Sequence, residues 1–79
     1  MRWIFKLIEK SERIFIYAYA RESEELDGRI SYDTKTGKIT VAKPCAKDKG
    51  KSYCLEKAAE HFQRVIEDNF PDERHVDCG

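Results

Sequence analysis

The sequence lacks an excess of charge of either sign. Its 79 residues include 15 Lys and Arg and 15 Asp and Glu, which gives a formal net charge of zero. A domain that binds nucleic acid or an anionic membrane electrostatically normally carries a clear basic excess. The charge balance therefore argues against both functions, while 41% hydrophobic residues are sufficient for a globular core.

Long apolar runs and a cysteine framework are also missing. No stretch approaches the roughly 18 consecutive apolar residues of a membrane-spanning helix. The three cysteines are Cys45, Cys54 and Cys78, and an odd, small number is a poor basis for structural disulfides. We therefore expect a protein of a reducing compartment, the cytoplasm, that makes no membrane contact.

Signals of enzyme chemistry are absent as well. The sequence shows no glycine-rich phosphate loop, no Ser, His and Asp grouping and no paired carboxylates in a catalytic pattern. A chain of this length builds a single two-layer domain, which leaves little concave volume for a substrate. We expect a non-enzymatic domain that requires no cofactor.

One long amphipathic segment, Ser52 to Asn69, is predicted to be a helix. Its apolar residues recur at helical spacing and fall on one narrow arc, opposite the charged residues. The apolar arc consists of Leu55, Ala58, Ala59, Phe62, Val65 and Ile66. Ser52 is the expected N-cap, and Phe70 before Pro71 is expected to end the helix.

The residues before this helix read as two β-hairpins. The second hairpin pairs residues 28–33 with 38–42 around a turn in which Asp33 bonds the backbone and Gly37 takes a positive φ. Pairing Asp33 with Lys38 places Ile30, Tyr32, Ile39 and Val41 on one face. The predicted fold is therefore a four-stranded antiparallel β-meander packed on one C-terminal α-helix (β-β-β-β-α, an α+β domain of two layers). It covers residues 1–70, and residues 71–79 are expected to form a short polar tail.

The first hairpin, with strands near residues 2–9 and 13–20, has two possible registers. A two-residue loop at Ser11 and Glu12 places Trp3, Phe5 and Leu7 on the helix side together with Ile14, Ile16, Ala18 and Ala20. A three-residue loop would turn the second strand over. We favour the first register, because it gives one fully apolar face on which the two alanines leave room for a helix.

The favoured register leaves an aromatic face uncovered, because one helix covers only one side of a sheet. The residues of that predicted face are Ile4, Lys6, Ile8, Phe15, Tyr17 and Tyr19. An exposed apolar and aromatic patch usually marks a contact surface, and most soluble oligomers are homo-oligomers. We therefore expect the protein to act by protein contact, as a homodimer or with another protein. An ordinary amphipathic sheet surface is the plainer interpretation.

The same face allows a second function, the binding of single-stranded nucleic acid. Tyrosine rings on an open sheet can stack with bases, and lysines in the following loop can contact phosphates. The candidate phosphate contacts are Lys43, Lys47, Lys49 and Lys51. The zero net charge disfavours this alternative. In addition, a lysine-rich loop is usually only a solvated loop.

The cysteines allow a third function, a thiol-redox pair or a zinc site. Cys45 and Cys54 are nine residues apart across a loop, and His75 and Cys78 would complete four zinc ligands. The spacing matches neither a Cys-x-x-Cys motif nor a zinc knuckle, so buried thiols without special chemistry are favoured. His61 lies about 10 Å along the helix from Cys54, too far to share one ion.

Overall fold

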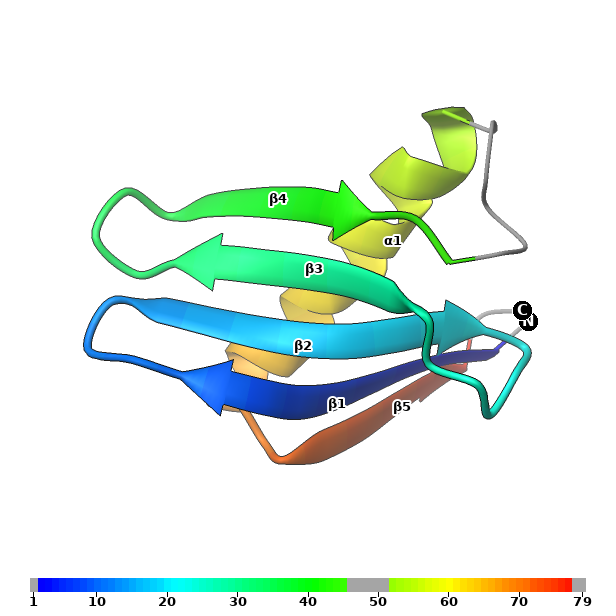
Figure 1. The fold of residues 1–79 in the computed structure, drawn as a ribbon, viewed down its shortest axis with the longest axis horizontal. Helices are drawn as coiled ribbons and strands as arrows, with labels where there is room; N and C mark the ends of the chain where they lie inside the picture. The colour runs from blue at the N-terminus through cyan, green and yellow to red at the C-terminus, as the bar shows by residue number, and fades with distance from the viewer. Residues whose placement is uncertain (1, 46–51, 78–79) are drawn as a thin grey trace.

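The computed structural model describes residues 2–45 and 52–77 and, within the helix, the side chains from residue 56 onward. These residues form one antiparallel sheet of five strands and one helix (Figure 1). The elements are β1 (Arg2–Lys10), β2 (Ile14–Arg21), β3 (Gly28–Asp33), β4 (Lys38–Lys43), α1 (Ser52–Glu67) and β5 (Glu73–Asp77). The α+β class is confirmed. The predicted four-stranded meander with a C-terminal helix is wrong, because a fifth strand follows the helix.

The fifth strand extends the sheet beyond β1, so that the strand order is β4-β3-β2-β1-β5. Val76 lies opposite Trp3 and is 5% exposed, and the Arg74 guanidinium forms an ion pair with Asp68 just after α1. Residues 73–77 were predicted to be part of a tail because Val76 is their only apolar residue. One apolar side chain gives no alternation, so the pairing depends on the free edge of β1 rather than on a local pattern.

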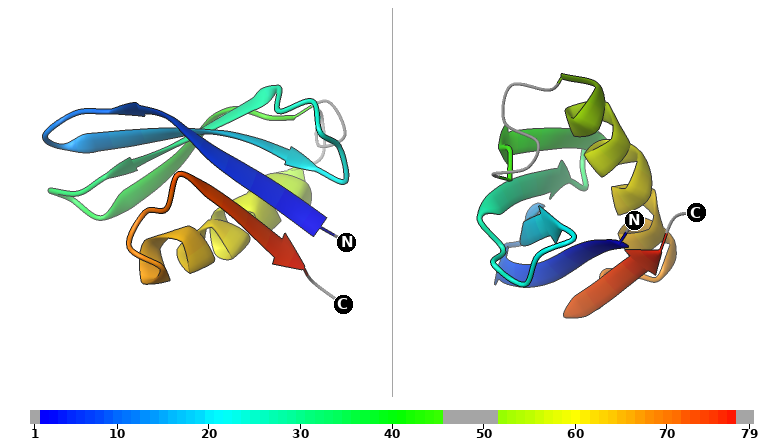
Figure 2. Two further views of the ribbon diagram at one scale, coloured as in Figure 1. Left: turned by 90° about the horizontal axis from the view of Figure 1, so that it is seen from below. Right: turned by 90° about the vertical axis from the view of Figure 1, so that its right-hand side faces the viewer.

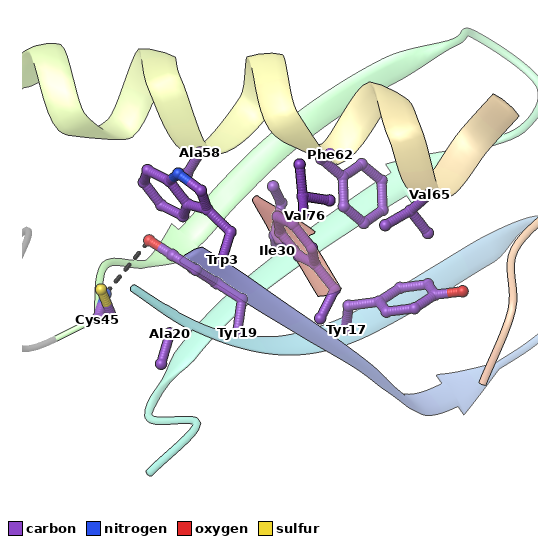
Figure 3. Packing of buried hydrophobic residues seen from close by; sticks show 11 residues of the cluster. Trp3, Tyr17, Tyr19, Ala20, Ile30, Cys45, Ala58, Phe62, Val65 and Val76 are labelled. Carbon is purple, nitrogen blue, oxygen red and sulfur yellow. Dashed lines mark hydrogen bonds between the residues drawn. The ribbon is translucent and has the colours of Figure 1, made fainter. Parts of the chain in front are cut away.

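The helix crosses one face of the twisted sheet on its way from β4 at one edge to β5 at the other (Figure 2). Ala58, Phe62 and Val65 are fully buried against that face, as the predicted apolar arc requires (Figure 3). The Phe62 ring meets the rings of Phe5 and Tyr17 edge-on, with centroids 5.5 and 5.3 Å away. Such edge-to-face pairs favour a fixed arrangement of rings over a fluid cluster.

The first hairpin does not have the favoured register, and the two faces of β2 are exchanged relative to that expectation. The Ser11 amide donates to the Ile14 carbonyl, and beyond this tight turn Glu9 lies opposite Ile16. One residue is then inserted at Ile8, because Leu7 lies opposite Tyr17 rather than opposite Ala18. A β-bulge of this kind reverses which side chains share a face, since side chains alternate along a strand.

The reversal puts three aromatic residues of β2 on the helix side. Tyr17 and Tyr19 have no exposed surface, and Phe15 packs on Phe70 with ring centroids 4.2 Å apart. The favoured register would have buried aliphatic side chains and alanines there instead. Large rings bury more apolar area beneath the helix, and this gain outweighs the regular pairing lost at the bulge.

Both buried tyrosines direct their hydroxyl groups to polar partners at the margin of the core. The Tyr17 hydroxyl donates to the Pro71 carbonyl at 2.6 Å, and the Tyr19 hydroxyl accepts from the Cys45 amide at 3.2 Å (Figure 3). Burial, assisted by the negative charge of Asp72, raises the pKa of Tyr17 to about 12. A tyrosine is therefore tolerated in this core because its polar end is satisfied.

Gly28 shows how tightly the sheet packs beside these rings. It lies opposite Tyr19, and a Cβ atom built at Gly28 would meet the Tyr19 ring at 2.4 Å. The ring covers the glycine, which explains why β3 begins with a residue that has no side chain.

The second hairpin has the predicted register. Asp33 lies opposite Lys38, and Ile30, Tyr32, Ile39 and Val41 all contribute to the helix-side core. Gly37 has a φ of 74°, and the Asp33 carboxylate accepts from the Lys35 amide at 2.9 Å. The turn chemistry predicted from the sequence is confirmed.

The helix ends at Glu67, two residues before the predicted end. Asn69 and Phe70 both have positive φ values, of 61° and 56°. The Phe70 amide donates to the Val65 carbonyl at 3.0 Å, and its ring lies on Phe15. A positive φ is unfavourable for phenylalanine, so the ring contact is what holds this turn in place.

Candidate functional site

The structure does not bring the six predicted contact residues onto one face. Phe15, Tyr17 and Tyr19 lie on the helix side, whereas Ile4 and Lys6 lie on the other face of β1. We call that second face, which is turned away from α1, the outer face. The prediction of a continuous aromatic contact surface is therefore wrong in its geometry, because it depended on the register that the bulge reverses.

The outer face carries aliphatic residues at its turn end. Alternation along β1 places Ile8 on the face of Lys6, and the reversed register places Ile14 and Ile16 beside it. Ile8 is 49% exposed, and the other two isoleucines are half-buried. We call Ile8, Ile14 and Ile16 the isoleucine patch.

Charged side chains of both signs flank this patch. Glu9 lies beside Ile16 on β1, and Lys38 lies across the sheet on β4. Both are exposed, and neither forms an ion pair with another residue that the structure describes. They are free to interact with a second molecule.

A third charged group beside the patch is already paired. The Arg13 guanidinium donates two parallel hydrogen bonds to the Asp33 carboxylate, Nε to Oδ1 at 3.0 Å and Nη2 to Oδ2 at 2.8 Å. These bonds, together with the backbone amides of Lys35 and Thr36, lower the pKa of Asp33 to about 2. The pair ties the turns of the two hairpins together.

The other end of the outer face is covered by residues 22–27. Glu22 has a φ of 56°, its amide donates to the Arg2 carbonyl at 2.8 Å, and the Arg29 guanidinium donates to the Leu26 carbonyl at 2.9 Å. Ile4, Ala18 and Ala20 are at most 5% exposed although they lie on the outer face. This acidic segment is folded back over the sheet.

The nucleic-acid alternative loses its stacking platform in this structure. Tyr17 and Tyr19 are buried beneath the helix, where no base can reach their rings. Lys43 is exposed at the end of β4, and the other three predicted phosphate contacts, Lys47, Lys49 and Lys51, lie outside the described residues. Nucleic-acid binding stays a prediction without an aromatic surface to carry it.

The predicted zinc ligands are not brought together where they are described. Cys45 is 1% exposed in the helix-side core next to β4, whereas His75 lies on the outer face of β5 at the opposite edge of the sheet. Cys78 and the side chain of Cys54 lie outside the described residues. Among residues 2–45 and 52–77, no group of three or more His, Cys, Asp or Glu side chains could hold a metal ion.

His61 lies at the margin of the core, where its side chain is half-buried. Its ring is 5.3 Å from the Trp3 ring, and partial burial lowers its pKa. It therefore favours the neutral form, which suits a packing role beside the indole.

The outer face is also a place where segments far apart in sequence meet, and the sequence pattern did not predict this. Residues 22–27, β1 and β5 lie together there, and the available signal was Leu26, a single apolar residue in an otherwise acidic stretch. Comparison with protein-family models, curated proteins and solved structures finds no match to this chain. Within the described part of the chain, no helix has the length and apolar character needed to cross a membrane.

Proposed function

We propose that the protein acts by contact with another protein chain, and that this chain is a second copy of itself bound through the isoleucine patch. The observation that carries the proposal is the exposure of Ile8, with Ile14 and Ile16 beside it, on the face opposite α1. Aliphatic side chains grouped on an open sheet are stabilised when a partner removes them from water.

The charges around the patch favour a second copy as the partner. The chain has no net charge, so two copies do not repel each other as a whole. A two-fold axis lying between the two sheets, parallel to the strands and above the β2–β3 pair, would place β1 of one copy over β4 of the other and bring Ile14 and Ile16 of the two copies together beside the axis. Glu9 of one copy would then lie over Thr40 of the other, two residues along β4 from Lys38, whose long side chain can reach the carboxylate, and the reciprocal pair would form as well.

The oligomeric state is the direct test. We expect sedimentation equilibrium over a range of protein concentrations to show a reversible species near twice the 9.3 kDa monomer mass. Ile8→Lys should shift the protein to monomer, because it places a charge within the apolar contact without disturbing a buried residue. Gln63→Lys, at an exposed position of α1, is the control that adds the same charge on the other side of the sheet.

Charge reversal tests the proposed orientation. Glu9→Lys and Lys38→Glu should each weaken the dimer, and the double variant should restore it, because each symmetric pair regains opposite charges. A monomer at every concentration would remove the proposal. A dimer that Ile8→Lys leaves intact would place the interface elsewhere on the molecule.

A further inference from the structure

A groove lies on the outer face at the end remote from the isoleucine patch. Its volume is about 320 Å³, at the small end of the range for small-molecule sites. Its floor is β1, one wall is the segment 22–27, and the other wall is β5. The lining residues are Arg2, Ile4, Lys6, Glu24, Leu26, Glu73 and His75.

The apolar part of the groove is fixed by the fold. Ile4 is 5% exposed, and Leu26 is half-buried against the core cluster. The wall that holds Leu26 is fastened at both ends by the Glu22 amide bond to Arg2 and the Arg29 bond to the Leu26 carbonyl. The groove is therefore formed before any ligand arrives, which lowers the ordering cost of binding.

The charged part of the groove contains one pair of side chains that contact each other and three solvent-exposed charged side chains. His75 Nε2 lies 3.0 Å from Glu73 Oε2, so these two side chains satisfy each other. The side chains of Arg2, Lys6 and Glu24 form no hydrogen bond or ion pair with any residue that the structure describes. Cations and an anion without partners thus surround an aliphatic surface.

From this arrangement we propose that the groove binds a small zwitterion with an aliphatic side chain, of which a free aliphatic α-amino acid is the simplest member. The guanidinium of Arg2 presents a planar fork that matches a carboxylate. Glu24 accepts from the ammonium group, and the aliphatic side chain lies on Ile4 and Leu26. A simple carboxylate fits less well, because it would leave Glu24 unpaired and close to the bound negative charge.

Three ligands of the same shape separate the contributions: L-leucine, 4-methylpentanoate without the ammonium group, and 3-methylbutylamine without the carboxylate. We expect NMR titration to give saturable shifts of the His75 and Ile4 signals with leucine, at a Kd on the order of 1 mM. Each analogue should bind at least about tenfold more weakly, because each loses one charge-assisted contact.

Variants assign the two contacts to their residues. Arg2→Gln should weaken leucine about tenfold, and Glu24→Gln should remove the preference for leucine over 4-methylpentanoate. Lys35→Gln, in the β3–β4 turn outside the groove, is the control and should leave both affinities unchanged.

Repeating the titration on the Ile8→Lys variant separates ligand binding from the proposed dimer. Ile8 does not line the groove, so leucine should bind this variant as it binds the unchanged protein. Absence of saturable shifts with leucine overturns the proposal. Equal binding of leucine and 4-methylpentanoate to the unchanged protein also overturns it, because Glu24 would then take no part.

Discussion

The two hairpins of this sheet obtain their registers from different sources. In β3–β4, the turn itself fixes the pairing through the Asp33 carboxylate and the positive φ of Gly37. In β1–β2, the turn at Glu12 and Arg13 is followed by a bulge at Ile8 that changes the pairing. The first case is decided by neighbours in sequence, and the second by which side chains pack beneath the helix.

An ambiguous turn leaves core packing to decide which side chains of a hairpin face the helix. The β1–β2 turn contains no glycine or asparagine that would demand one geometry. The chain then adopts the pairing that buries Tyr17 and Tyr19 with Phe5, and it accommodates the mismatch as one extra residue. The stability of β1–β2 should therefore fall when a core side chain is replaced and change little when a turn residue is replaced. The stability of β3–β4 should fall when a turn residue is replaced.

The largest expected effect comes from removing a core ring of the first hairpin. Phe5→Ala should lower the free energy of unfolding by about 3–5 kcal/mol, because Phe5 is fully buried and its ring contacts Tyr19 and Phe62. Urea unfolding followed by circular dichroism measures the change.

The neighbouring residue supplies the control for this prediction. Lys6→Ala lies one position along the same strand but on the outer face, and it should change the stability by no more than about 0.5 kcal/mol. Similar losses for the two variants would contradict the assignment of faces in β1.

The second expected effect is at the turn of β3–β4. Gly37→Ala should cost about 1–2 kcal/mol, because an L-residue is strained at a φ of 74°. Gly37→Asn should cost less, since asparagine tolerates this conformation better than alanine does. Equal costs in the same unfolding assay would show that the side chain itself, rather than the backbone angle, is responsible.

The fold was predictable from the sequence where the deciding contacts are local. The apolar arc containing Ala58, Phe62 and Val65 and the turn at Gly37 both follow from spacing and turn chemistry. The position of β5 was not predictable, because it depends on the free edge of β1 and on one docked side chain, Val76.

The candidate surfaces were less predictable than the fold, because the one residue inserted at the β1 bulge determines which side chains of the first hairpin are exposed. Ile8 was expected to be exposed and is exposed, whereas Tyr17 and Tyr19 were expected to be exposed and are buried. The groove at the other end requires three segments far apart in sequence, so no spacing pattern could indicate it. Only Leu26, in its acidic surroundings, hints that residues 22–27 are fixed to the sheet.

The smallest expected effect concerns the ion pair that joins the two hairpins. Bonds from Arg13 lower the pKa of Asp33 from 3.8 to about 2, so folding favours the ionised carboxylate. The resulting stabilisation is fully present above about pH 4 and is lost as the pH falls through about 2. Asp33→Asn should therefore narrow the difference in stability between pH 5 and pH 2, measured by urea unfolding at each pH. Arg13→Gln removes the partner of the Asp33 carboxylate and should narrow the same difference. If neither variant narrows the difference, general charge repulsion at low pH, rather than the link between the hairpins, governs the acid response.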